Sequence, residues 1–134
     1  MSPRRSGRTI ECTATECRSR REQARAFLEV AELVLSEDRH EAHVAAALAV
    51  LAGIAATDAI CGFSLGRWSR GQDHKQAATL LGEVALRDTT LPAKLRRLLA
   101  DKDAAHYSPN LITVATARNM VRQATALLAE ADAQ

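Results

Sequence analysis

The chain has 134 residues and a formal net charge of +2, and this length fits one folded domain with little room for a second. It contains 27 alanines and 16 leucines but only four aromatic residues, a composition that favours closely packed helices and argues against a β-sandwich or β-barrel. The shortage of aromatic side chains also argues against the stacking surfaces with which many proteins bind single-stranded nucleic acid.

Positive charge is concentrated at the amino terminus, where residues 1–25 hold seven arginines against three glutamates. We expect residues 1–15 to form a basic, flexible arm and residues 16–134 to form one helical bundle. Such an arm is typical of a solvated terminus, and it is also able to contact phosphate or an acidic partner. No apolar stretch follows the arginines, so we expect no secretory signal and a cytoplasmic protein.

Apolar residues recur at steps of three and four along most of the remaining chain, which is the period of amphipathic helices. The pattern predicts five helices, at about Glu16–Leu35, His40–Leu65, Asp73–Ala85, Leu91–Tyr107 and Thr113–Ala131. Their short connections favour an all-α fold, an antiparallel bundle of four to five helices.

The second of these helices is the most apolar, and one of its faces carries a stripe of small residues that lets another helix approach closely. The stripe consists of Ala45, Ala49, Ala52, Gly53 and Ala56. The segment Val44–Phe63 has about the length of a membrane span, but Asp58 would place a carboxylate inside the hydrocarbon. We therefore expect the central helix of a soluble bundle and no membrane.

Asp58 is informative because a buried carboxylate needs a partner to remain charged. We predict that it meets a basic group or a hydrogen-bond donor from another helix. The pair is either a structural ion pair or part of a catalytic site.

The cysteines and the remaining histidines carry less information. Cys12 and Cys17 match no zinc or redox spacing, and Cys61 lies in an apolar helix, so we expect no disulfide framework. His40 and His43 lie one helical turn apart and could share a metal, but the sequence fixes no third ligand. We predict neither a metal nor a cofactor.

The loop before the third predicted helix contains a second histidine-bearing segment, Gly71–His74. Asp73 is suited to capping the helix, and His74 would lie in its first turn. Arg67 and His74 have an arginine-to-histidine spacing that matters below, but we interpret this spacing as coincidental because a loop separates them.

The strongest group of polar residues ends the fourth predicted helix. Lys102, Asp103 and His106 would share one helical face, so that a cation, a carboxylate and an imidazole lie together. These groups suit phosphate chemistry: the imidazole exchanges a proton, the ammonium stabilises charge and the carboxylate orients the ring. The supporting candidates are Asp58, Tyr107 and Arg97. A mixed-charge helix end with no chemical role is the alternative.

The order of these segments resembles the HEPN superfamily of small bacterial helical bundles. The resemblance rests on Ala55–Ile60 at the end of the long helix, on Gly71–His74, on Lys102–Tyr107 and on a final amphipathic helix. It implies a four- or five-helix bundle, often a homodimer, and for many members a metal-independent endoribonuclease in a toxin-antitoxin or defence system.

The resemblance also implies how the motif would work. Lys102 would stand for the family's arginine, Asp103 for the polar residue after it and His106 for the catalytic histidine. Lysine replaces arginine, and only three residues separate Lys102 from His106, so two functions remain open. One is an endoribonuclease with a degenerate motif, and the other is a non-catalytic scaffold or partner of a nucleotidyltransferase or another protein, such as a cognate antitoxin.

Overall fold

In this computed structural model of the chain, the described residues are 5–6, 9–70, 74–102, 105 and 110–134. Their helices are α1 (Ala14–Val34), α2 (Arg39–Leu65), α3 (His74–Leu81), α4 (Leu91–Ala100) and α6 (Val114–Asp132). Three short strands, β1 (Arg5–Ser6), β2 (Thr9–Glu11) and β3 (Arg67–Ser69), pair antiparallel in the order β1-β2-β3. The mostly helical structure agrees with the predicted all-α class.

The small sheet is a difference from the sequence analysis, which placed residues 1–15 in a flexible arm. Within that segment, β2 pairs with β3, and Thr9 is almost completely buried. Strands of two or three residues are too short for an alternating pattern to be recognised. The sheet therefore attaches the amino-terminal segment to the end of α2.

Capping residues explain where the first two helices begin. Thr13 and Glu16 form a reciprocal capping box, in which the Glu16 N–H donates to Thr13 Oγ1 at 3.1 Å and the Thr13 N–H donates to Glu16 Oε1 at 2.9 Å. The helix thus starts two residues earlier than predicted. Asp38 caps α2 by accepting the N–H groups of His40 and Glu41, as expected for the acidic break before this helix.

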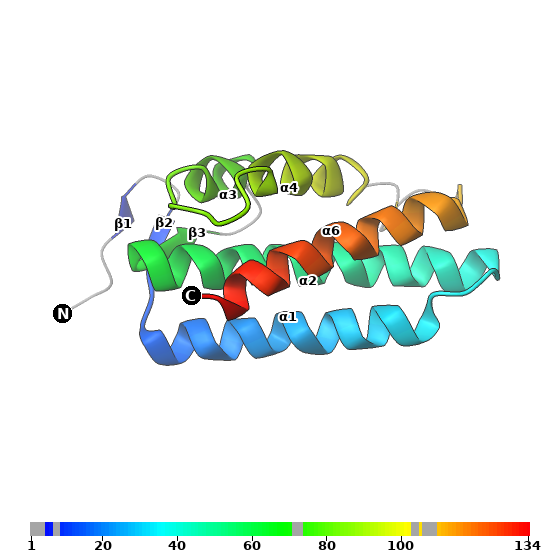
Figure 1. Cartoon of the computed structure of the whole chain (residues 1–134), viewed down its shortest axis with the longest axis horizontal. Coiled ribbons are helices and arrows are strands. Elements are labelled where there is room, and N and C mark those ends of the chain that lie inside the picture. Colours follow the sequence, from blue (N-terminus) through cyan, green and yellow to red (C-terminus); the bar gives the residue numbers. More distant parts are fainter. Residues whose placement is uncertain (1–4, 7–8, 71–73, 103–104, 106–109) are drawn as a thin grey trace.

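Helix α2 lies at the centre of the structure, and α1, α3, α4 and α6 all pack against it (Figure 1). The predicted small-residue stripe is completely buried. Within the described residues, only α2 is long and apolar enough to cross a membrane, but most of its apolar stretch is buried inside the structure. This burial is consistent with the core helix of a soluble protein.

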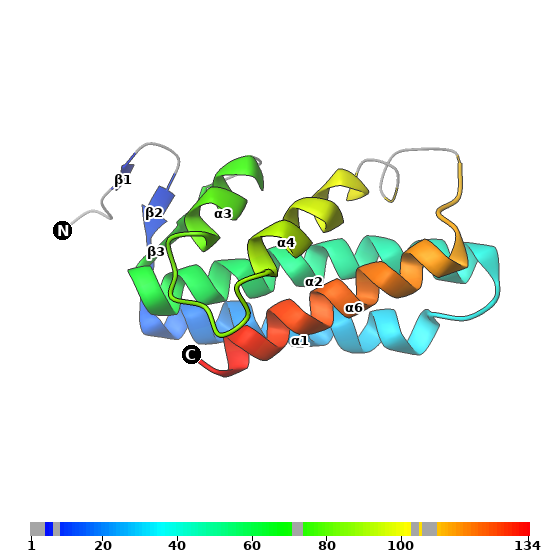
Figure 2. The same ribbon diagram turned by 45° about the horizontal axis from the view of Figure 1, so that its top comes forward.

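The helix directions differ in one respect from the predicted antiparallel bundle. Helices α1 and α2 form an antiparallel hairpin, but α6 runs in the same direction as α2 (Figures 1 and 2). At one end the Ile112 N–H donates to His43 Nδ1 at 3.0 Å, and at the other end Ser64 Oγ donates to Gln134 Oε1. The connection through α3 and α4 returns the chain to the beginning of α2, which makes the parallel pair possible.

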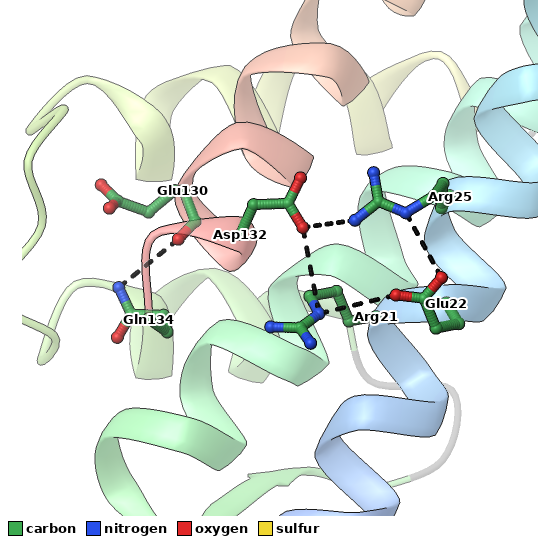
Figure 3. A network of polar contacts seen from close by, with 6 residues as sticks. All are labelled: Arg21, Glu22, Arg25, Glu130, Asp132 and Gln134. Atoms are coloured by element: carbon green, nitrogen blue, oxygen red, sulfur yellow. Dashed lines mark hydrogen bonds and ion pairs between the residues drawn. The ribbon is translucent and has the colours of Figure 1, made fainter.

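Polar contacts join α1 to the carboxyl end of α6 (Figure 3). Asp132 accepts a hydrogen bond from the Arg25 guanidinium and lies 3.9 Å from Arg21 Nε. The Arg21 guanidinium also lies over the Phe63 ring of α2, 5.2 Å from its centroid. These contacts fix α1 against both α2 and α6.

Gly53→Ala tests the close packing on α2. A Cβ at this position would lie 2.3 Å from Leu98 Cδ2 of α4, so Leu98 would have to move in a filled core. Overpacking costs about 1–3 kcal/mol, and the higher helix propensity of alanine returns about 1 kcal/mol. We expect a net loss of about 1 kcal/mol in the free energy of unfolding, measured by urea denaturation.

The control is Glu29→Ala on the exposed face of α1, where the change should be small. Gly53→Ala should also cost less when Leu98 is already alanine, because the space is then open. Equal costs in the two backgrounds would contradict this packing.

Candidate functional site

A cavity of about 290 Å³ lies where α1, α2, α3 and β3 meet. Its lining residues are Arg20, Ile54, Asp58, Trp68, Ser69, His74 and Ala77. The three ionisable residues come from three different helices, since Arg20 belongs to α1, Asp58 to α2 and His74 to α3. The cavity is near the lower end of the size range of small-molecule sites.

The predicted partner of Asp58 is Arg20. The Arg20 Nε donates to Asp58 Oδ2 at 3.0 Å, and the Arg20 Nη1 donates to Gln23 Oε1 at 2.8 Å. The Asp58 side chain is 12% exposed, whereas the Arg20 side chain is 30% exposed. The structure therefore confirms a buried carboxylate that meets a basic group from another helix, and it leaves part of the cation open to solvent.

The Asp58 carboxyl group holds its proton more tightly than usual. Burial raises its pKa from 3.8 to about 6, although the charge and hydrogen bond of Arg20 act in the opposite direction. Desolvation thus outweighs the ion pair. Near neutral pH a measurable fraction of the molecules carries a neutral acid at this position.

His74 faces the same cavity from the first residue of α3. Its Nε2 is buried and has no hydrogen-bond partner among the described residues. Burial, and secondarily the positive charge of Lys102, lower the pKa of the imidazole from its ordinary value of 6.5. Burial therefore favours the neutral form of the His74 imidazole, a residue that lines the cavity.

Arg67 and His74 do not both line the cavity, which agrees with the interpretation of their spacing as coincidental. Arg67 is not a lining residue of the cavity, and its Nη2 lies 3.4 Å from Glu83 Oε1. His74 was interpreted only as part of a helix start, but it lines the cavity beside Asp58. Sequence spacing missed it because its partners, Arg20 and Asp58, are distant in the sequence.

The predicted motif at the end of the fourth helix is only partly within the described residues. Asp103, His106 and Tyr107 lie outside them. Lys102 is described, and its charge influences His74, which places it near the cavity. Arg97 is exposed on α4 and is not a lining residue of the cavity.

The fourth predicted helix, Leu91–Tyr107, does not continue as one helix. Helix α4 ends at Ala100, where the Asp101 N–H donates to the carbonyl groups of Leu98 and Leu99. Lys102 and Ala105 are again helical, and the Ala105 N–H donates to Asp101 O at 3.0 Å. The tighter turn at Asp101 separates α4 from Lys102.

A second cavity, of about 310 Å³, lies beside Glu130 of α6. Glu130 Oε1 accepts the backbone N–H groups of Arg87 and Asp88, at 2.8 and 3.1 Å. This carboxylate fixes the loop between α3 and α4, a role that the sequence analysis missed because the loop has no recognisable pattern.

His43, which the sequence paired with His40, accepts the Ile112 N–H and so helps to position the beginning of α6. In the part of the chain that the structure describes, no group of three or more His, Cys, Asp or Glu side chains is arranged to hold a metal ion.

Comparison with known proteins finds no family model and no curated protein that matches the chain.

Asp58→Asn tests the raised pKa. Because the carboxyl group has a pKa of about 6 when folded and 3.8 as its ordinary value, protonation favours the folded state. The stability from Asp58 is fully present below pH 3.8 and is lost as the pH rises through about 6. Between pH 3.5 and 7.5 wild type should lose about 3 kcal/mol relative to Asp58→Asn, measured by urea denaturation.

Glu29→Gln, which changes an exposed carboxylate of α1, should show no such trend and serves as the control. A difference between wild type and Asp58→Asn that stays constant over this pH range would rule out the raised pKa.

Proposed function

We propose that the chain is a HEPN-like, metal-independent endoribonuclease of a toxin-antitoxin or defence system that acts in the cytoplasm. We place its acid-base groups in the cavity between α1, α2 and α3. The observation that carries this proposal is the buried, unpartnered Nε2 of His74 in the same cavity as the Arg20–Asp58 pair. The cavity thus combines a proton acceptor, a proton donor and a cation.

Two cationic groups support binding of a phosphodiester. The Arg20 guanidinium is partly open to solvent and is held by Asp58, so its remaining N–H groups are oriented. Lys102 adds positive charge near His74. Trp68, the chain's one tryptophan, also lines the cavity, and an indole ring is a group on which a base can stack.

The proposed reaction needs no residue to form a covalent bond with RNA. His74 accepts the proton of a ribose 2'-hydroxyl, and the resulting oxygen attacks the adjacent phosphorus atom. Asp58 in its protonated form donates its proton to the departing 5'-oxygen. The products are a 2',3'-cyclic phosphate and a 5'-hydroxyl end. His74 then releases its proton to solvent and Asp58 takes one up, which restores both residues.

His74→Ala should reduce cleavage of single-stranded RNA by about 100- to 10,000-fold, since this is the usual contribution of a positioned acid or base. His40→Ala is the control, because His40 is exposed at the start of α2. Wild-type cleavage should persist in EDTA. Full activity of His74→Ala, or loss of wild-type activity in EDTA, would contradict the proposal.

The cleavage rate should have a bell-shaped pH dependence that falls as the pH rises above about 6. The base His74 must be unprotonated, which requires a pH above its lowered pKa. The acid Asp58 must be protonated, and it loses its proton as the pH rises above its pKa of about 6. In the variant Asp58→Asn, the cleavage rate should no longer fall as the pH rises above about 6. A wild-type rate that rises steadily to pH 9 would exclude Asp58 as the acid.

The motif proposed from the sequence makes a competing prediction. If Lys102, Asp103 and His106 perform the chemistry, His106→Ala should abolish cleavage while His74→Ala leaves it intact. Lys102→Arg should then raise the rate, because arginine offers a planar, bidentate donor to phosphate. RNA that stays intact with wild type and with Lys102→Arg would instead favour the non-catalytic scaffold or partner protein.

We also propose a homodimer. Val30 and Leu33 of α1 and Val44 of α2 are large apolar side chains that remain exposed near the α1–α2 turn, and a second copy could cover them. Light scattering at micromolar concentration should give twice the mass of the 14.5 kDa chain, and Leu33→Asp should lower it. A monomer mass for wild type would exclude the dimer.

A further inference from the structure

Two cysteine sulfurs lie in contact at the junction between β2 and α1. Cys12 Sγ and Cys17 Sγ are 3.7 Å apart, although five positions separate the residues in sequence. Cys12 follows β2 directly, and its N–H donates to Gly66 O at 3.0 Å. Cys17 belongs to α1, and its N–H donates to Thr13 O at 3.0 Å. Backbone hydrogen bonds therefore hold both residues where their sulfurs meet.

The absence of a side chain at Gly62 provides the space for this pair. A Cβ at Gly62 would lie 2.4 Å from Cys17 Sγ and 2.9 Å from Cys12 Sγ. Both sulfurs are thus packed against the backbone of α2. A disulfide has an S–S length of about 2.05 Å, so the two sulfurs need to approach by less than ~2 Å to form one.

The two cysteines differ in their access to solvent. Cys17 is only 1% exposed, whereas Cys12 is partly exposed and can be reached by a small reagent. Cys61, the third cysteine, is buried in α2. Exchange with a disulfide reagent needs one thiol that the reagent can reach and a second thiol that then displaces the reagent from the first. Cys12 meets the first requirement and Cys17 meets the second.

We propose that Cys12 and Cys17 are a redox-sensitive modification site that a small-molecule disulfide converts to an intramolecular disulfide. The deprotonated Cys12 sulfur attacks one sulfur of the reagent, and the first reagent thiolate leaves and takes up a proton. The Cys17 sulfur then loses its proton to solvent and attacks Cys12 Sγ, which releases the second reagent thiolate. Two electrons pass from the cysteine pair to the reagent, which is reduced to two thiols.

The disulfide would connect β2 to the first turns of α1. Because β2 pairs with β3, and Trp68 and Ser69 of β3 line the cavity, the bond would also restrain one wall of that cavity. Burial and the neighbouring Cys17 thiol raise the pKa of Cys12 to about 12, so most molecules keep this thiol protonated and the exchange is slow near neutral pH. The bond is therefore a response to sustained oxidation.

The test uses the whole chain, incubated with oxidised glutathione at pH 8, then unfolded, alkylated and digested with trypsin. Both cysteines lie in the tryptic segment 9–18, whereas Cys61 lies in another segment. We expect segment 9–18 to escape alkylation and to be lighter than its reduced form by two hydrogen atoms. Before digestion, the oxidised chain should melt about 5 °C higher than the reduced chain.

The variants Cys12→Ser and Cys17→Ser are the matched controls, and each should fail to form the internal bond. Cys61→Ala should still form it. Because peptide mapping of wild type identifies the bond by itself, the proposal remains testable if a variant does not fold. It is overturned if segment 9–18 is alkylated at both cysteines after prolonged oxidation, or if the disulfide involves Cys61 or a second chain.

Discussion

The Arg20–Asp58 contact connects the packing of the bundle to its chemistry. Asp58 lies on the most apolar helix, where an unpaired carboxylate would be strongly unfavourable, and Arg20 of α1 approaches it to 3.0 Å. Yet the carboxyl pKa is raised to about 6, so burial dominates over the attraction of the guanidinium. This balance orients α1 on α2 and leaves a group that exchanges protons near neutral pH.

The cavity depends on elements that join the bundle from different parts of the chain. Helix α2 has small side chains along its buried face, so α1, α4 and α6 approach it closely, as at Gly53 with Leu98 and Leu127. The short sheet then brings Trp68 and Ser69 to the cavity, and α3 brings His74. The local arrangement thus follows from close packing around α2 and from one strand pair at its carboxyl end.

Local patterns in the sequence identify most of the helical structure. The period of apolar residues predicts α1, α2 and α6 to within a few residues, and Asp38 marks the start of α2 correctly. The sequence predicts that Asp58 meets a basic group or a hydrogen-bond donor from another helix. It does not identify Arg20 as that group, because Arg20 and Asp58 are 38 positions apart. The early start of α1 was missed, although Thr13 and Glu16 have the spacing of a capping box.

The remaining features depend on contacts that sequence spacing does not encode. Cys12 and Cys17 have no known redox spacing, yet a strand-to-helix junction brings their sulfurs together. His74 was placed in the first turn of a helix, as found, but no local pattern indicates that tertiary packing buries its Nε2. The end of α4 at Ala100 was missed because the leucine pattern gives no sign of the tighter turn at Asp101.

Asp58 and His74 line the same cavity, where burial raises the pKa of the carboxyl group and lowers the pKa of the imidazole, and nuclear magnetic resonance of the carboxyl and imidazole carbons measures both shifts directly. We predict that the Asp58 carboxyl carbon titrates at about pH 6 and the His74 ring below its ordinary value of 6.5. Asp58→Asn, used to assign the carboxyl signal, should remove the first transition. An Asp58 carboxyl carbon that titrates near 3.8, as in a solvated aspartate, would contradict the account.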